Sequence, residues 1–277
     1  MNLIPINDLS DPRLAPYANM RDAELAQRAD PLDRAAHGGL FVAEGELVLR
    51  RLVASRFAVH SVLTTASRVE TLRDDLGGLP AEVPVFVAEQ RVLNEIVGFN
   101  MHRGVLAIGR RGAGLSLGEL CARPGPLVVL EDLVNHDNIG GIFRNAGALG
   151  GKGVGIVLSP RCADPLYRKS VRVSMGCALD VPYSRAEAWP EALHTIAEAG
   201  FETLALTPGQ GSVPIREAVG TGGKVALVLG GEGPGLTETA MGACSRRVKI
   251  PMNKVSESVD SLNVAMAAGI ALFCLSS

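Results

Sequence analysis

The chain has 277 residues, long enough for two domains that each bury a core. Hydrophobic residues make up 47% of the sequence and charged residues 20%, and this ordinary globular usage excludes a disordered chain and a coiled coil. The formal net charge of -2 and the aromatic content of 4% exclude a globally basic or aromatic-rich nucleic-acid binder, so any RNA contact must depend on a local patch of Arg and Lys.

The first segment, residues 1–30, is predicted to be an extension lying on the surface, with a short helix near residues 23–28. Prolines at positions 5, 12 and 16 interrupt it. Its beginning lacks a basic stretch followed by an apolar one, so we expect no signal peptide and a cytoplasmic protein.

The next segment, residues 31–111, is predicted to be a small α/β domain. Short β-rich apolar runs alternate in it with patterns of helical period. Strands are expected at 40–42, 59–64, 83–87 and 105–109, and helices at 46–54 and 90–97.

A stretch rich in Gly and Pro, residues 112–126, is predicted to be a linker. Beyond it, residues 127–277 carry short apolar runs without polar alternation, which predicts a parallel sheet covered by helices on both faces. These strands are expected at 127–130, 154–158, 203–206, 225–229 and 248–250. Open sheets of this kind bind ligands at the carboxyl ends of their strands.

The cysteines and histidines give no sign of a metal site. The five cysteines form no CxxC pair and the five histidines are scattered, so neither a zinc site nor a disulfide framework is expected. The most apolar stretch, residues 264–275, is much shorter than the ~20 residues of a membrane span. It is predicted to be a core or interface helix, and we expect no membrane association.

Three polar clusters follow predicted strands of the second domain. The first contains Asn138 and Arg144 at the start of a helix, six residues apart, and both are expected to project toward the same loop mouth. Considered alone, this cluster is equally consistent with a capping Asn and a surface Arg. The second cluster, residues 230–235, has four glycines in six positions and lets the backbone approach a ligand closely. Its spacing matches neither a dinucleotide fingerprint nor a P-loop.

The third cluster is Ile250-Pro-Met252, followed by Ser261-Leu-Asn263 at the start of a helix of small residues. Considered alone, it is typical of a helix cap. The order NxGxxxRxA, LxLGxEGxGL, then IPM with SLNVxxAxxI, resembles the three motifs of the SpoU (TrmH-like) branch of the SPOUT methyltransferases. The resemblance covers residues 127–275, about half of the chain.

This resemblance implies a knotted α/β fold, in which the C-terminal parallel-sheet domain contains a deep trefoil knot that holds S-adenosyl-L-methionine. It also implies a homodimer whose active sites are completed across the interface. The departures from the family pattern include Asn145 and Ala265, where Thr or Ser are frequent. The expected cofactor-binding residues are Thr207, Leu229, Gly230, Gly231, Glu232, Gly233, Ile250, Met252, Ser261, Leu262 and Asn263.

The reaction that the resemblance implies is methylation of a ribose 2′-hydroxyl of ribosomal or transfer RNA, without a metal. Arg144 is expected to orient the hydroxyl and a phosphate, because a guanidinium with a pKa above ~12 is a poor base. Asn138 is expected to bind the ribose or to fix Arg144, and Glu232 to orient Arg144 or the loop. Ser261 and Asn263 complete the expected catalytic set.

The RNA contacts are expected from two regions. Residues 41–45 and 102–106 resemble the small RNA-binding domain that often precedes the catalytic domain in this family. A basic cluster after the second strand of the sheet is predicted to contact phosphates, although a solvated helix face is an equally good interpretation. It consists of Arg161, Arg168, Lys169 and Arg172.

Three other functions remain open at this point: a SPOUT enzyme that methylates a base nitrogen, a catalytically silent RNA-binding or assembly factor, and a plain nucleotide-binding α/β protein. The Ser-Leu-Asn motif at residues 261–263 together with Arg144 favours ribose chemistry over base methylation. The complete set of motifs disfavours the silent factor.

Overall fold

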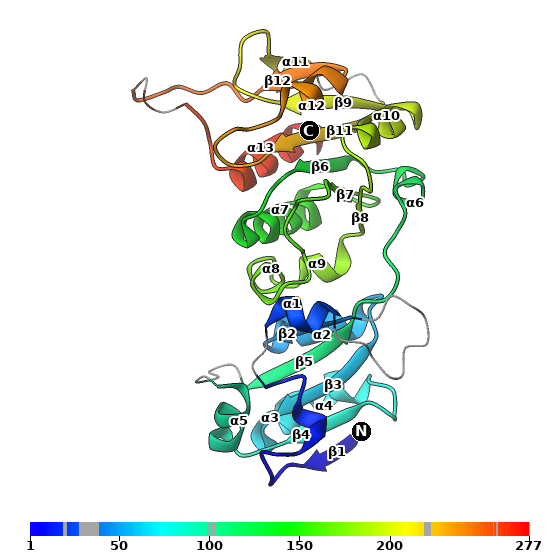
Figure 1. The fold of residues 1–277 in the computed structure, drawn as a ribbon, viewed down its shortest axis with the longest axis vertical. Coiled ribbons are helices and arrows are strands. Elements are labelled where there is room, and N and C mark those ends of the chain that lie inside the picture. The colour runs from blue at the N-terminus through cyan, green and yellow to red at the C-terminus, as the bar shows by residue number, and fades with distance from the viewer. Residues whose placement is uncertain are drawn as a thin grey trace. The chain divides into compact units, whose positions relative to one another are not determined.

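The computed structural model describes residues 1–18, 21–27, 39–98, 100, 104–218, 223–256, 258 and 260–276. The chain divides into two compact units (Figure 1). The first contains Met1–Ala113 with Leu166–Asp180, and the second contains Gly114–Pro165 with Val181–Ser277. Residue 31, the predicted start of the small domain, and residues 102 and 103 of the predicted RNA-binding motif lie outside the described residues.

The first unit is built on a five-stranded mixed sheet with the order β1-β4-β3-β5-β2. β1, β4 and β3 are parallel, whereas β5 is antiparallel to both β3 and β2. The predicted strands and helices of this region are confirmed to within two residues. The strands are β1 (Asn2–Pro5), β2 (Leu40–Glu44), β3 (Val59–Thr64), β4 (Pro84–Val87) and β5 (Val105–Arg110), and the α-helices are α1 (Asp22–Gln27), α2 (Glu46–Ala54), α3 (Ala66–Thr71), α4 (Arg73–Gly77) and α5 (Gln90–Val97).

The N-terminal segment is part of this fold, and its predicted position as a surface extension is wrong. β1 adds an edge strand beside β4. Leu14 and Tyr17 are buried in the core of the unit, and the Tyr17 hydroxyl lies 2.7 Å from Ser61 Oγ. Burial raises the pKa of this phenol. Pro5 ends β1 and Pro12 begins a 3-10 helix, Pro12–Leu14, so these prolines do not prevent the packing of the segment.

The stretch Leu166–Asp180 differs from the predicted organisation, because it falls within residues 127–277 but belongs to the first compact unit. Its helices α8 (Arg168–Val173) and α9 (Cys177–Asp180) contact β2 and α2. The Arg168 guanidinium donates to Glu44 Oε2 at 3.0 Å, and Glu44 is buried. Contacts between residues more than a hundred positions apart leave no local pattern in a sequence.

The second unit contains the predicted parallel sheet, which is confirmed. It has seven strands in the order β10-β12-β9-β11-β6-β7-β8, and every neighbouring pair is parallel. Its central strands are buried, as their uninterrupted apolar sequences require. The strands are β6 (Leu127–Glu131), β7 (Gly155–Leu158), β8 (Tyr183–Arg185), β9 (Phe201–Leu206), β10 (Val213–Pro214), β11 (Lys224–Gly230) and β12 (Arg246–Lys249).

Helices pack on this sheet, and α7 (His136–Leu149) and α13 (Val264–Ser276) lie side by side (Figure 1). No helix in the described part of the chain is long and apolar enough to span a membrane. The other helices of the unit are α6 (Leu117–Cys121), α10 (Glu191–Glu198), α11 (Ile215–Ala218) and α12 (Glu238–Ala243).

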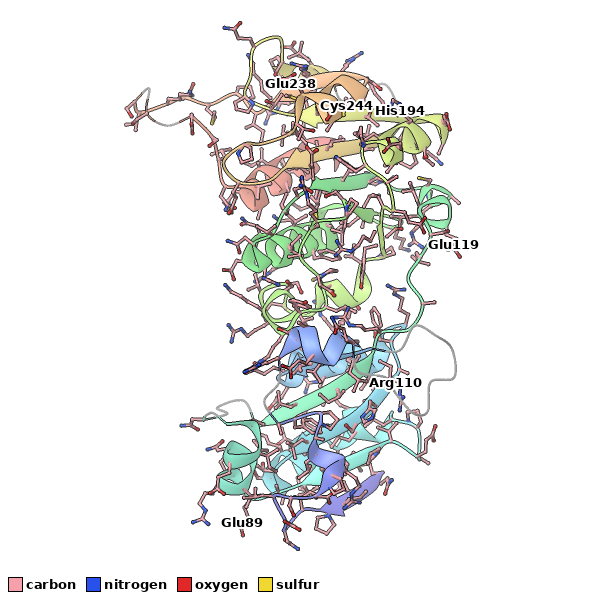
Figure 2. All side chains as sticks on the ribbon, viewed as in Figure 1. Glu89, Arg110, Glu119, His194, Glu238 and Cys244 are labelled. Carbon is pink, nitrogen blue, oxygen red and sulfur yellow. The ribbon has the colours of Figure 1, made fainter. Side chains whose placement is uncertain are left out.

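Part of the predicted linker, residues 112–126, is folded. α6 begins with a capping box: Ser116 Oγ accepts from the Glu119 N–H at 3.2 Å, and the Glu119 carboxylate accepts from the Ser116 N–H at 2.8 Å. Figure 2 labels Glu119 on this helix. Leu120 on this helix is fully buried in the core of the second unit. The Gly and Pro content of the stretch predicts a linker throughout, whereas the structure contains one short helix there.

Candidate active site

A cavity of about 620 Å³ lies at the carboxyl ends of β9, β11 and β12. The loops that follow these strands line it, together with the start of α13. A volume of this size is typical of sites for small molecules. All eleven residues predicted to bind the cofactor line this cavity: Thr207, Leu229, Gly230, Gly231, Glu232, Gly233, Ile250, Met252, Ser261, Leu262 and Asn263.

The loop after β11 requires glycine at several positions. The Gly235 N–H donates to the Gly231 carbonyl at 3.1 Å, which closes the loop into a tight turn. Gly233 and Gly235 have φ values of 86° and 69°, which residues other than glycine rarely adopt. A Cβ atom on Gly231 would lie 2.9 Å from the Asp132 carbonyl oxygen. The loop therefore presents backbone groups, with the Glu232 side chain among them.

One hydrogen-bonded group links the three sequence motifs. Asn138 lies in the first turn of α7 and is 5% exposed. Its Nδ2 donates to the Glu232 carboxylate, and its Oδ1 accepts from Asn263 Nδ2 at 2.9 Å. The Asn263 side chain also caps α13, because its Oδ1 accepts from the Ala265 N–H at 3.0 Å. The structure thus brings together three of the five predicted catalytic residues.

Ser261 lies at the rim of the same cavity and is exposed. Its hydroxyl donates to Asp260 Oδ1 at 2.9 Å. The two departures from the family pattern also meet, because Asn145 Nδ2 donates to the Ala265 carbonyl at 2.7 Å. This contact ties α7 to the first turn of α13, beside the Ser261 loop.

Arg144 does not join the other predicted catalytic residues in this chain. At about 100° per residue, six residues turn a helix by roughly 240°, so Asn138 and Arg144 face different sides of α7. Neither side chain lines the cavity itself, but Asn138 is buried and bonded to Glu232 and Asn263 of its wall, whereas Arg144 is exposed. With the residues that the structure describes, Arg144 makes no hydrogen bond or ion pair. The expectation that both side chains project toward one loop mouth is wrong.

The four predicted phosphate contacts are divided between the two units. Arg161 is in the second unit and forms an ion pair with Asp132, and this pairing lowers the pKa of the Asp132 carboxyl. The other three are on α8 in the first unit, where Arg168 is paired with Glu44 and Lys169 and Arg172 are exposed.

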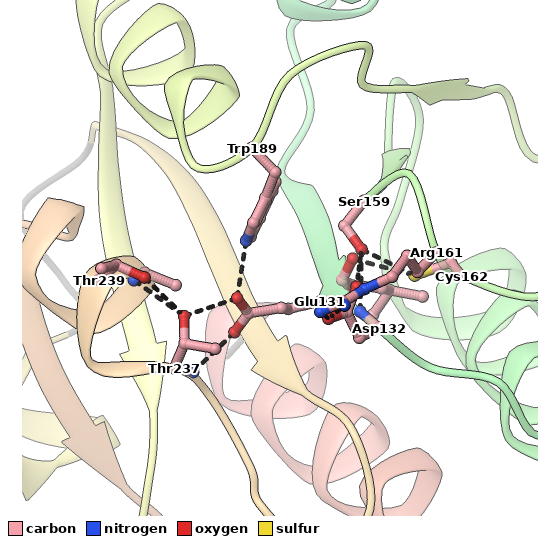
Figure 3. A network of polar contacts seen from close by, with 10 residues as sticks. Glu131, Asp132, Ser159, Arg161, Cys162, Trp189, Thr237 and Thr239 are labelled. Carbon is pink, nitrogen blue, oxygen red and sulfur yellow. Dashed lines mark hydrogen bonds and ion pairs between the residues drawn. The ribbon is translucent and has the colours of Figure 1, made fainter.

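A polar network at the end of β6 was not predicted from the sequence (Figure 3). Glu131 accepts hydrogen bonds from Trp189 Nε1 and from Thr237, at the start of α12. The next residue, Asp132, points away from it toward Ser159 and Arg161. The sequence did contain one indication of this network, because Glu131 and Asp132 are acidic residues at the end of an otherwise apolar run. Their partners are remote in the sequence.

The profile of the SpoU rRNA Methylase family matches residues 125–273. A protein of Mycobacterium tuberculosis (strain ATCC 25618 / H37Rv) named as an uncharacterized tRNA/rRNA methyltransferase is 42% identical over 269 residues, which cover 96% of this chain and 89% of that protein. The 23S rRNA (adenosine(1067)-2′-O)-methyltransferase of Streptomyces azureus is 26% identical over 223 residues, 77% of this chain and 81% of that one.

Solved structures resemble this fold along nearly the whole chain. The AdoMet-bound rRNA methyltransferase from Sinorhizobium meliloti superposes with a TM-score of 0.77 at 22% identity, covering 99% of this chain and 97% of that one. Similarity at this level of identity concerns the fold alone. It extends over both compact units, including the segment before residue 125 that the family profile does not reach.

Proposed function

The chain belongs to the SpoU rRNA Methylase family, and on this premise we propose that it transfers a methyl group from S-adenosyl-L-methionine to a ribose 2′-hydroxyl of ribosomal or transfer RNA. The observation that carries the proposal is that the second and third motifs line one cavity and that Asn138 of the first motif is hydrogen-bonded to both, through Glu232 and Asn263. The relatives named above as a tRNA/rRNA and a 2′-O-methyltransferase support the substrate class and the reaction.

The cavity fits the cofactor in size and in chemistry. Its volume of about 620 Å³ suits a nucleoside with an amino-acid tail. Apolar side chains such as Leu229, Ile250 and Met252 can cover a purine ring, while the loop glycines present backbone donors and acceptors to polar groups. When bound, the cofactor supplies an electrophilic methyl group on a sulfonium.

The protein's own task is then to hold the ribose oxygen in line with that methyl group and to assist the loss of its proton. We assign Asn138 to the ribose side of the cavity, held by Glu232 and Asn263. Ser261 lies at the rim, where its hydroxyl can hydrogen-bond the ribose or the cofactor. Arg144 is assigned to orienting the hydroxyl and an adjacent phosphate, because its planar fork of donors suits both.

Because Arg144 is exposed and, unlike Asn138, is bonded to no described residue that lines the cavity of its own chain, we propose that it completes the site of a second copy in a homodimer. α13 offers a surface on which such a second copy can pack. Met266, Ile270 and Phe273 recur at helical spacing and are 62%, 39% and 55% exposed. An apolar face of this kind is typical of a covered interface.

We propose that the second unit contains the trefoil knot that the family resemblance implies. Two segments support this proposal, since the chain after β9 and the chain between β12 and α13 both border the cavity although more than forty positions separate them. The segment 127–277 is assigned to catalysis, and the segment 31–111 to holding RNA. Arg161, Lys169 and Arg172 are assigned to phosphate contacts. The RNA substrate implies a cytoplasmic site of action.

Labelled product decides between this function and its rivals. The protein is incubated with total ribosomal and transfer RNA and with S-adenosylmethionine labelled in its methyl group, and the RNA is then hydrolysed with alkali. A methylated 2′-oxygen blocks cleavage of the next bond, so the label is expected in alkali-resistant dinucleotides. Label in mononucleotides would indicate base methylation. Cofactor binding without any transfer to RNA would indicate a silent assembly factor.

A further inference from the structure

Glu131 is a buried carboxylate outside the cavity that no step assigned above requires. It is the last residue of β6 and is 1% exposed. Three donors converge on it (Figure 3): Trp189 Nε1 at 2.7 Å and Thr237 Oγ1 at 2.7 Å on one oxygen, and the Thr237 N–H at 2.8 Å on the other. Both carboxylate oxygens are therefore used.

These contacts place Glu131 at both ends of the Gly-rich loop. Its backbone pairs with Gly230 in the ladder between β6 and β11, which fixes the start of the loop. Its side chain holds Thr237, the N-cap of α12, immediately after the end of the loop. The two ends also touch, because a Cβ atom on Gly230 would lie 2.1 Å from the carbonyl carbon of Gly235.

The loop between these ends lines the cavity and carries Glu232 to Asn138. Glycines give such a loop many conformations to lose when a ligand orders it. A clamp at its base removes part of this cost before the ligand arrives, which raises affinity. Glu131 and Trp189 do not line the cavity, so they can act on a ligand only through the loop.

We infer that Glu131 is a positioning residue that preorganises the Gly-rich loop for the cofactor, with Thr237 and Trp189 as its partners. The inference rests on the proposed function, because it takes S-adenosylmethionine as the ligand of the cavity. Asp132, its neighbour in the sequence, has no such role, since its carboxylate faces Ser159 and Arg161.

The test compares Glu131→Gln with Asp132→Asn in the full-length protein. A Gln amide cannot accept at both oxygen positions, so at least one of the three buried donors loses its partner. The Asn control makes the same chemical change one residue away and tolerates the positive φ of 53° at that position. The probe is S-adenosylhomocysteine, titrated into each protein by calorimetry.

We expect Glu131→Gln to raise the Kd about tenfold, which corresponds to ~1.4 kcal/mol, and Asp132→Asn to stay within about threefold of the wild type. In the methylation assay, Glu131→Gln is expected to raise the cofactor KM by a similar factor with little change in kcat. A purely structural role would instead lower the folded fraction, and hence kcat, without moving KM.

Each of the other outcomes also supports or overturns the inference. An unchanged Kd for Glu131→Gln, or an equal loss in both variants, overturns the inference alone. A wild-type protein that does not bind the probe refutes the proposed function and this inference with it. If Glu131→Gln does not fold, Thr237→Val removes one donor and keeps the carboxylate, and unchanged affinity in that variant likewise overturns the inference.

Discussion

Replacing Arg144 by alanine tests the catalytic assignment most directly. The side chain is exposed and without a partner among the described residues, so its loss should change the free energy of unfolding by less than ~0.5 kcal/mol. A positioned group of this kind contributes about two orders of magnitude in rate, or ~2.7 kcal/mol. We expect Arg144→Ala to lower methyl transfer about a hundredfold while the Kd for S-adenosylhomocysteine stays unchanged.

Mixed dimers show which copy supplies the arginine. A subunit carrying Arg144→Ala is paired with a subunit carrying Gly231→Val, a change expected to displace the Gly-rich loop and disable the cavity of its own subunit. In a mixed dimer the intact cavity of one subunit meets the intact Arg144 of the other. Since random mixing makes half of the dimers mixed, each with one working site of two, about a quarter of the wild-type activity should return.

The assay is methyl incorporation into RNA after the two inactive proteins are unfolded together and refolded, with each protein refolded alone as the control. If Arg144 served its own subunit, no mixed dimer would contain a complete site and no activity would return. That result would refute the assignment across the interface. Full activity of Arg144→Ala by itself would remove the catalytic role, and Arg144→Lys should restore little because an ammonium lacks the planar fork.

Three further predictions follow from packing and burial. Gly231→Val should abolish binding of S-adenosylhomocysteine in calorimetry, because its Cβ would lie 2.9 Å from the Asp132 carbonyl oxygen and the loop that lines the cavity would have to shift; retained affinity would mean that the loop is only a turn. Ile270→Glu should yield monomers in sedimentation, whereas Leu47→Glu, at 40% exposure against 39%, should not; dimers of Ile270→Glu would place the interface elsewhere. Burial raises the pKa of Cys244, at the end of α12 (Figure 2), from 9.0 to about 11, so its thiol should stay protonated at pH 8 and react with iodoacetamide far more slowly than in the unfolded chain. The stability linked to it should be fully present below pH 9 and be lost progressively as the pH rises from 9 toward 11; equal reaction rates in mass spectrometry would contradict that burial.

Much of the fold could be predicted from local patterns. The apolar runs at 127–130, 203–206 and 225–229 predict buried parallel strands, and β6, β9 and β11 are found there. The residues of the cavity were predicted from the resemblance of their motifs to the SpoU family, and local patterns support that prediction. Glycine repeats and the Ser-Leu-Asn sequence follow strands directly, and the carboxyl ends of parallel strands meet at one edge of a sheet.

Other features depend on contacts that no local pattern encodes. β1 is a four-residue edge strand that depends on pairing with β4, about eighty positions away. The assignment of Leu166–Asp180 to the first unit depends on contacts with β2 and α2. In both cases the stabilising partner is distant in the chain. The local sequence therefore predicts a surface extension for the first segment and membership of the second domain for the other.

By itself, the sequence indicated which residues line the cavity, because their motifs resemble those of the SpoU family and each follows a predicted strand. Only the tertiary structure decided which of the predicted residues contact one another. It turned Asn138 inward to Glu232 and left Arg144 on the outer face of α7, since side-chain direction follows the rotation of a packed helix. It also placed Glu131 at the two ends of the Gly-rich loop, because the donors of Trp189 and Thr237, both distant in the sequence, meet at this buried carboxylate only after the sheet and its helices have assembled.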